Sequence, residues 1–303
     1  MRKLKPALHF FGLRLFWVYL LLGAISWRVM DRAMINDCFQ LKLLNDLLPK
    51  TYAPLADLAA GKTIPPRELE NFFRYFERLT ISYPKMAEGY GLLGFCQYYR
   101  GKLDDAVNNY DRAMAINQNF FWFPFNRGVI DFRQKKYVDA VRSLQNAILS
   151  NPKVVFAAVK SSPRVYARVF LGNPYYNQDL FAQYQEGLRA AYCLLVESLF
   201  RLRRYDEAMR YCVEAIENNL NENSYFTYRA GLSAFYSQNY PAAAVFLKKH
   251  LDKTSDPGAM RYFGLALREI GQVQTADLIL NAAPVAAVSP LDKVADQIQL
   301  QPY

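Results

Sequence analysis

The segment KYVDAVRSLQNAILSNP, residues 136–152, predicts an amphipathic helix that ends before a proline. Its apolar residues recur at helical spacing, and they include the small residue Ala140. The segment RYDEAMRYCVEAIENN, residues 204–219, repeats this pattern with Ala208 in the matching place. The two alanines are 68 residues apart, which is twice 34. Similar helices at a multiple of 34 residues indicate an internal repeat, which predicts further helices of this kind at the same spacing.

Three more predicted helices carry an alanine in the same phase. The alanines that set the phase are Ala106, Ala140, Ala208, Ala243 and Ala276. Twelve residues before each alanine lies a second position, which is glycine in all repeats but one: Gly94, Gly128, Val196, Gly231 and Gly264. A small residue on a first helix lets a second helix approach closely, and the alanine on that second helix completes the contact. The pattern therefore predicts an array of two-helix hairpins.

Together these small positions resemble the tetratricopeptide repeat (TPR) family, over roughly residues 86–284. The resemblance implies an all-α fold, a TPR-type α-solenoid of helical hairpins over residues 66–284. Repeats are expected near residues 87–120, 121–154, 155–188, 189–222, 224–256 and 257–284. The third of these lacks the small residues and has Pro174 in place of the alanine, so it is either a degenerate repeat or an insertion of similar length. We expect broken helices there, with a loop around residues 172–174.

The N-terminal stretch MRKLKPALHFFGLRLFWVYLLLGAISW is basic at first and then apolar. Its apolar span, about residues 7–27, is long enough to cross a bilayer as a helix. We therefore expect a single transmembrane helix within an anchor over residues 1–34. A cleaved signal peptide and an interfacial amphipathic helix are the alternatives. A juxtamembrane helix and linker are expected over residues 35–65, and a C-terminal tail over residues 285–303.

Four residues of the anchor are expected to meet the membrane: Arg14, Trp17, Trp27 and Arg28. Arg14 lies near the middle of the span, where a charge costs about 2.5–3.5 kcal/mol on insertion scales. It either faces a partner helix or anionic headgroups, or it snorkels to the interface. The basic residues before the span favour a cytoplasmic N-terminus. The body is then expected to be extracytoplasmic, on the periplasmic side of a bacterial inner membrane.

The segment NFFWFPFNRG, residues 119–128, begins a predicted first helix with a cluster of aromatic residues. In the TPR family, fixed positions of each first helix line a concave groove. Carried over to this chain, these positions are Phe95, Tyr98, Tyr99, Trp122, Phe125, Phe132, Phe200, Arg201, Tyr225, Tyr228, Phe235 and Tyr236. An aromatic groove implies a protein partner with apolar anchor residues. Two alternatives stay open: the rings pack between repeats, or the chain's own segment PLDKVADQIQLQPY, residues 290–303, folds back onto them.

Basic residues recur in the turns inside the predicted hairpins. They are Arg100, Lys102, Arg133, Lys135, Lys136, Arg201, Arg203 and Arg204. In a chain with a net charge of +10, stacked repeats would line these residues up as a basic edge that meets anionic lipid or an acidic subunit. Any one of these turns taken alone is better explained as a solubilising surface. Nucleic acid is not expected as a partner, because an extracytoplasmic body would not meet it.

Residue types that support catalysis are scarce. The two histidines are His9, in the apolar N-terminal stretch, and His250, in a Lys-Lys-His run that is expected to face solvent. The four cysteines show no CxxC spacing and are expected to be small core residues, although Cys193 and Cys212 could face each other across a hairpin as a disulfide. Neither a nucleophile–base pair nor a phosphate loop is evident. We therefore expect no metal, no cofactor and no enzymatic activity.

The sequence thus predicts a non-enzymatic, membrane-anchored TPR scaffold. Through its aromatic-lined groove it would bind protein subunits of a larger membrane or envelope complex and help to assemble or hold them, while the N-terminal helix contacts membrane lipid. The alternative is a periplasmic chaperone or quality-control adaptor that binds client segments transiently. The two hypotheses differ in the stoichiometry and lifetime of the complex, which the sequence does not determine.

Overall fold

The computed structural model describes residues 54–118, 120–150, 180–283 and 289–301. These residues form helices and loops, with no β-strand among them. The chain forms two compact units, residues 1–51 and residues 52–303, and every described residue belongs to the second unit. The predicted transmembrane helix lies outside the described residues. None of the helices in the described ranges combines the length and the apolar character needed to cross a bilayer.

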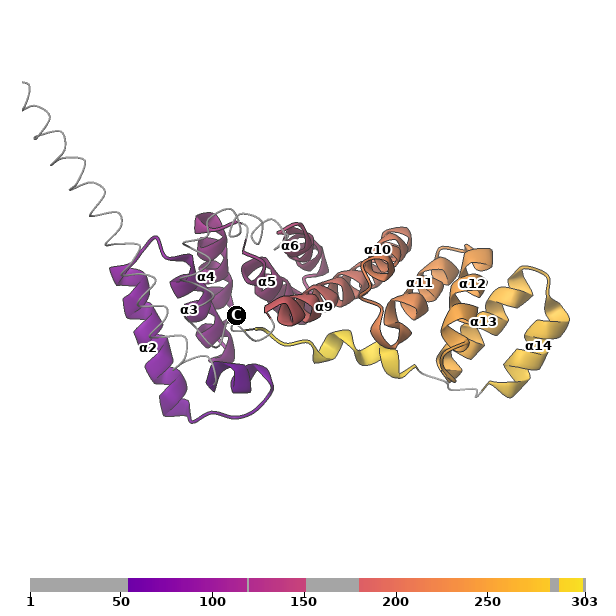
Figure 1. Cartoon of the computed structure of the whole chain (residues 1–303), viewed down its shortest axis with the longest axis horizontal. Coiled ribbons are helices and arrows are strands. Elements are labelled where there is room, and N and C mark those ends of the chain that lie inside the picture. Colours follow the sequence, from indigo (N-terminus) through magenta and orange to yellow (C-terminus); the bar gives the residue numbers. More distant parts are fainter. Residues whose placement is uncertain (1–53, 119, 151–179, 284–288, 302–303) are drawn as a thin grey trace, which may run out of the picture. The chain divides into compact units, whose positions relative to one another are not determined.

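The described α-helices follow one another along the chain, and each packs against the next (Figure 1). Residues 54–59 are helical. From residue 66 on, the α-helices are α2 (Pro66–Ser82), α3 (Ala87–Tyr99), α4 (Leu103–Ile116), α5 (Trp122–Arg133), α6 (Tyr137–Leu149), α9 (Leu180–Arg201), α10 (Tyr205–Glu217), α11 (Tyr225–Tyr236), α12 (Tyr240–Leu251), α13 (Pro257–Glu269) and α14 (Val273–Ala282). Three short 3₁₀ helices complete the set: η1 (Glu222–Ser224), η2 (Pro290–Lys293) and η3 (Ala295–Gln297). The hairpins α3–α4, α5–α6, α11–α12 and α13–α14 each lie within one of the expected repeats.

The close approach of the two helices in a hairpin depends on glycine in the first helix. A Cβ atom added at Gly128 in α5 would lie 2.7 Å from Leu144 Cγ in α6, and one added at Gly231 in α11 would lie 2.7 Å from Leu247 Cγ in α12. Both distances are far inside van der Waals contact, so a side chain at either position would displace the leucine of the second helix. The alanines that set the repeat phase are fully buried in the second helices: Ala106, Ala140, Ala208, Ala243 and Ala276.

The turn inside each of these hairpins, and the turn between α9 and α10, has the same backbone conformation. One residue in each turn has a positive φ between 59° and 85°: Gly101, Lys135, Arg203, Gln238 and Gly271. The residue after it donates its N–H to a carbonyl five positions back, as Lys136 does to Asp131 at 2.9 Å. This Schellman-type closure satisfies a carbonyl at the end of the first helix. Lys135 and Arg203 of the predicted basic edge therefore occupy a position that the turn geometry determines.

Broken helices are expected over residues 155–188, and of these the structure describes residues 180–188, which lie in helix α9. It continues without interruption for 22 residues, so the end of the expected repeat 155–188 and the first helix of the next repeat are one element. Gly187 lies inside this helix, and an added Cβ atom there would lie 2.6 Å from the ring of Trp122. The glycine therefore makes room for a side chain from α5 and does not end the helix. The expected loop around residues 172–174 lies outside the described residues.

The prediction that His250 faces solvent is wrong. His250 is fully buried, because it takes the small position of its repeat, seven residues after Ala243. Its Nε2 atom lies 3.0 Å from Thr254 Oγ1 and 3.4 Å from Asp256 Oδ2. These two polar contacts replace the hydrogen bonds to water that Nε2 loses on burial.

The described cysteines are free thiols in the core. Cys96, Cys193 and Cys212 are all buried, as expected for small apolar residues, and the disulfide considered for Cys193 and Cys212 is not present. Burial raises the pKa of Cys193 to about 12. Such a thiol stays protonated near neutral pH and is a poor nucleophile.

Candidate functional site

Residues 289–301, called the tail below, lie on a face formed by the first helices of several hairpins. The tail begins beside α13, passes α11 and α9, and ends beside α5, so it runs against the order of the repeats (Figure 1). The side chains that hold it by hydrogen bonds from these first helices define the tail-binding face: Asn126, Arg133, Tyr228 and Arg229. The fold-back of the tail, one of the alternatives that the sequence left open, is therefore present.

Asn126 of α5 holds both backbone groups of one tail residue. Its Oδ1 atom accepts the N–H of Gln301 at 2.9 Å, and its Nδ2 atom donates to the carbonyl of Gln301 at 2.7 Å. Nδ2 also lies 3.2 Å from the hydroxyl of Tyr110, and Asn126 is fully buried. Because the two bonds to Gln301 involve only its backbone, they do not depend on its side chain. Asn126 thus pairs with the backbone N–H and C=O of Gln301 and not with its side chain.

The tail next to Asn126 is extended and in part deeply buried. Ile298 has φ −70° and ψ 129°, and its carbonyl accepts a hydrogen bond from Arg133 Nη2 at 3.1 Å. The other terminal nitrogen of Arg133 donates to the hydroxyl of Tyr98 in α3. Leu300 is fully buried. Backbone hydrogen bonds and one apolar side chain together hold this end of the tail.

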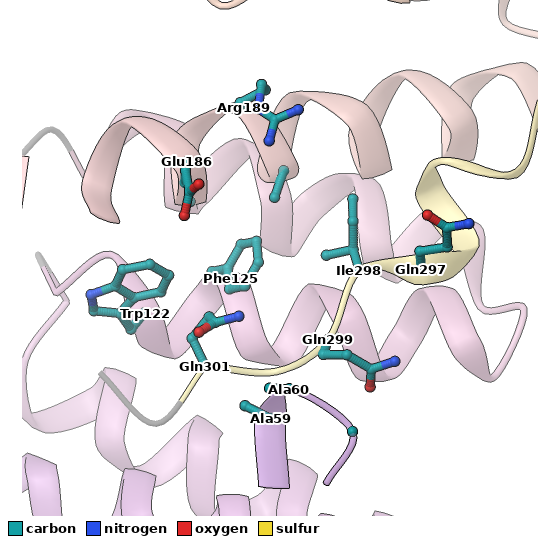
Figure 2. A pocket seen from close by; sticks show the side chains of 13 residues that line it. Ala59, Ala60, Trp122, Phe125, Glu186, Arg189, Gln297, Ile298, Gln299 and Gln301 are labelled. Carbon is teal, nitrogen blue, oxygen red and sulfur yellow. The ribbon is translucent and has the colours of Figure 1, made fainter. Parts of the chain in front are cut away.

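A cavity of about 610 Å³ opens beside the same end of the tail (Figure 2). Its walls come from α5, α9 and the tail, and they include Trp122, Phe125, Glu186 and Arg189. In Figure 2, Ile298 and Gln299 point to opposite sides of the tail, as neighbouring side chains of an extended chain do. The half-buried ring of Trp122 borders this cavity.

Charged residues meet where the tail passes α9 and α11. Glu197 of α9 and Arg229 of α11 are almost fully buried, with Glu197 Oε2 2.8 Å from Arg229 Nη2. The other carboxylate oxygen of Glu197 lies 2.8 Å from Arg201 Nε. Asp292 of the tail completes the group: its Oδ1 lies 3.4 Å from Arg229 Nη1 and 3.3 Å from the hydroxyl of Tyr228. A buried charge is tolerated only while it keeps such partners.

The surroundings of Arg229 keep it positively charged. Burial alone would lower the pKa of Arg229, but Tyr225, Glu197 and Asp292 raise it above its ordinary value. Three aromatic rings face the guanidinium group, with centroids 5.4, 5.8 and 5.9 Å from Cζ. Its Nε atom is buried and has no hydrogen-bond partner within the described part of the chain. Arg229 is therefore a buried cation whose ion-pair partners are the carboxylates of Glu197 and Asp292.

Asp256, the N-cap of α13, holds the start of the tail. It accepts hydrogen bonds from the backbone N–H groups of Gly258 at 2.9 Å and Ala259 at 3.2 Å, and from the hydroxyl of Ser289. Burial alone would raise the pKa of Asp256, but hydrogen bonds from His250, Ser289 and the two backbone groups lower it below its ordinary value. A Cβ atom added at Gly258 would lie 2.9 Å from Ser289 N, so this glycine makes room for the tail.

Ser289, Asp256 and His250 do not form a catalytic triad. The hydroxyl of Ser289 and the imidazole of His250 both contact the carboxylate of Asp256, and no hydrogen bond joins the first two in the described structure. A serine nucleophile needs a direct hydrogen bond to its base. Within the described ranges, no group of three or more His, Cys, Asp or Glu residues is placed to hold a metal ion. These residues instead tie the tail to α13.

The aromatic residues predicted to line the groove divide by burial. Five are buried: Phe95, Phe125, Phe132, Tyr225 and Tyr228. Five are half-buried: Tyr98, Tyr99, Trp122, Phe200 and Phe235. Tyr236 is exposed, with 41% of its surface accessible. The packing of rings between helices, the other alternative left open by the sequence, is thus also present.

The predicted basic residues are all exposed, and several of them form ion pairs or hydrogen bonds. Arg100 lies 3.1 Å from Glu70 of α2, and Arg204 binds both carboxylate oxygens of Glu207. Arg133 and Arg201 contact residues of the tail and of α9, as described above. The remaining four keep exposed side chains in the hairpin turns: Lys102, Lys135, Lys136 and Arg203.

The polar residues of the face were not identified as ligands from the sequence. Asn126 and Arg229 take the sixth position of the expected repeats 121–154 and 224–256, and Glu197 takes the ninth position of the repeat 189–222. Their shared place on first helices was therefore a usable signal. The groove prediction named the aromatic rings of these helices and did not predict that charged side chains would be buried among them.

No family model matches the sequence, and no curated protein matches it either. Solved structures resemble the fold. YrrB, a TPR protein with an unusual peptide-binding site, is 14% identical in an alignment that covers 69% of this chain and 90% of YrrB, with a TM-score of 0.50. PilF of Pseudomonas aeruginosa is 13% identical over 70% of this chain and 90% of its own, with a TM-score of 0.40. The TPR domain of P58(IPK) is 14% identical over 83% and 74%, with a TM-score of 0.29.

The likeness to YrrB shows the fold. The described helices agree with it, because they form hairpins whose close contacts recur with the 34-residue phase. The described part of this chain therefore has the all-helical fold of a TPR α-solenoid.

Proposed function

We propose that this protein is a non-enzymatic, membrane-anchored scaffold that holds protein subunits of a larger membrane or envelope complex. In this proposal an extended segment of a partner binds on the tail-binding face. The observation that carries the proposal is the pair of hydrogen bonds between Asn126 and the backbone of Gln301. These two bonds use only the backbone of Gln301, so an extended segment of another protein can form them as well. The peptide-binding site named for YrrB belongs to a protein of the same fold and is consistent with this use.

The tail already occupies the face in the isolated chain, so a partner has to displace it. Only molecules whose face is free can bind a partner. The apparent affinity is therefore the intrinsic affinity multiplied by the fraction of molecules whose face is free. This favours a second candidate function, in which the protein is a chaperone or quality-control adaptor that exchanges client segments. A stable scaffold requires a partner that binds more tightly than the tail does.

A photo-crosslinking residue at Tyr236 tests the proposed binding face. Tyr236 is exposed and lines a cavity together with Arg229 and Asp292 of the charged group. In native membranes we expect crosslinks from this position to a subunit of a membrane complex, with several-fold more product when the tail carries Asp292→Asn. The control is the same residue at Leu278 on α14, which is 74% exposed. Equal crosslinking at both positions, or none at Tyr236, would contradict the proposal.

Membrane fractionation tests the proposed anchor over residues 1–34. We expect the full-length chain to stay in the membrane pellet after washes with alkaline carbonate and with high salt, because a helix that spans the bilayer is held by its buried apolar surface. A chain that lacks residues 1–34 should be released under both conditions. Release of the full-length chain by either wash would instead indicate an interfacial helix.

A further inference from the structure

We propose that the tail imitates the natural partner, and that the bound segment of this partner carries an acidic side chain that replaces Asp292 at Arg229. The inference rests on the proposed function and adds the chemistry of the partner. It also makes the tail an internal competitor: the partner binds only as the tail leaves.

The charged group shows why an acidic residue is needed. Glu197 and Arg229 are 3% and 4% exposed and lie 2.8 Å apart, so their pairing belongs to the fold. Asp292 is 34% exposed and lies at the longer distance of 3.4 Å from Arg229, so it is the exchangeable member. When Asp292 leaves, two guanidinium groups, those of Arg229 and Arg201, share the single carboxylate of Glu197. A carboxylate from a partner replaces the negative charge that Arg229 loses when Asp292 leaves.

A second acidic residue of the tail faces basic residues as well. Asp296 lines a cavity of about 510 Å³ together with Arg133, Lys135 and Arg201. Asp296 also contributes to raising the pKa of Arg201, although the hydrogen bond with Glu197 is the main cause. The tail thus presents two carboxylates to a basic surface, which is the arrangement expected for an acidic ligand.

The spacing of the tail residues defines the ligand further. Asp292, Asp296 and Leu300 follow one another at intervals of four residues, and Gln301 comes next at Asn126. Leu300 is fully buried, whereas Gln301 is held through its backbone. A partner segment that fits has an acidic residue, a second acidic residue four positions later, and an aliphatic residue four positions after that. Its final part is extended and runs against the order of the repeats.

The tail competes strongly because it is part of the same chain. A tethered segment acts at an effective concentration that is on the order of millimolar for a short linker. A free peptide with the same sequence is therefore expected to bind the wild-type chain weakly. Weakening the tail should reveal the full affinity of the face.

Peptide titration tests this inference. The probe is a fluorescent, end-capped peptide with the sequence SPLDKVADQIQLQ of residues 289–301. It is titrated in mild detergent into the full-length wild-type chain and into a full-length chain with Asp292→Asn, Asp296→Asn and Leu300→Ala. We expect the altered chain to bind the probe at least tenfold more tightly. Circular dichroism shows whether both chains have the same helix content.

Two altered probes test the acidic residues. A probe with asparagine in place of both aspartates is expected to bind the altered chain at least about tenfold more weakly, because hydrogen bonds to charged groups are lost. A control probe with Lys293→Gln changes the net charge without touching the carboxylates, and it should bind about as well as the original.

The outcomes separate this inference from the proposed function. If the acidic and the amide probes bind the altered chain equally well, the face binds peptides, but the inference that the partner carries acidic residues is wrong. If neither probe binds at millimolar concentration, the proposed function itself, peptide binding by this face, is wrong. Equal binding of the probe by the wild-type and altered chains would show that the tail does not compete. A wild-type dimer that the probe dissociates would show that a second copy's tail is the occupant, and this too would overturn the inference.

Discussion

Replacing Arg229 by methionine is expected to lower the free energy of unfolding by about 3–5 kcal/mol. The change leaves the carboxylate of Glu197 buried with Arg201 as its remaining partner, and it removes the ion pair with Asp292 of the tail. Most of the loss comes from a buried charge that has lost a close partner. Urea unfolding of the full-length chain in mild detergent, followed by circular dichroism, measures the effect.

The double variant Glu197→Leu, Arg229→Met is the control for this experiment. It removes both buried charges and leaves apolar side chains of similar volume, so we expect it to be clearly more stable than Arg229→Met alone. The two single changes therefore should not add. If the loss in the double variant equals the sum of the losses in the single variants, the pair is not coupled and Arg229 does not stabilise Glu197.

Replacing Phe125 by alanine is expected to lower the free energy of unfolding by about 3–5 kcal/mol. The ring is 1% exposed, it stacks on Phe121 with centroids 5.6 Å apart, and it meets Trp122 edge-on at 5.5 Å. Its removal leaves a cavity between packed helices. The measurement is again the shift of the urea midpoint in the full-length chain.

The matched control is Tyr236→Ala, since the sequence places Phe125 and Tyr236 in the same predicted groove. Tyr236 is exposed, so its replacement should cost no more than about 1 kcal/mol. The difference between the two variants shows whether an aromatic position serves packing in the core or recognition of a partner. If Phe125→Ala leaves the midpoint unchanged and removes partner binding, the ring serves recognition and its assignment to the core is wrong.

The hairpins were predictable because their signal is repeated and local. Gly128 and Leu144 are only 16 residues apart, and the same glycine–leucine pair recurs at Gly231 and Leu247. Each repeat buries the same face against its neighbour, so the small residues return in one phase. One hairpin can be misjudged in such a pattern, but several in agreement identify the fold.

The third repeat shows where this reasoning fails. The missing small residues and Pro174 lead to the expectation of broken helices over residues 155–188, and Gly187 lies near the end of that range. In the structure it allows Trp122, 65 positions earlier, to pack against an unbroken α9. His250 is a similar case: its lysine neighbours indicate a surface, whereas its contact with Asp256 belongs to the core.

The sequence by itself determined that this protein is an all-helical array of TPR-like hairpins, because helical period and small-residue spacing act within single repeats. Only the tertiary structure decided which aromatic rings are buried, that Glu197 pairs with Arg229, and that the tail occupies the face. The contact between Asn126 and Gln301 joins residues that are 175 positions apart. No periodicity in either segment specifies such a contact, since it depends on how all the intervening helices stack.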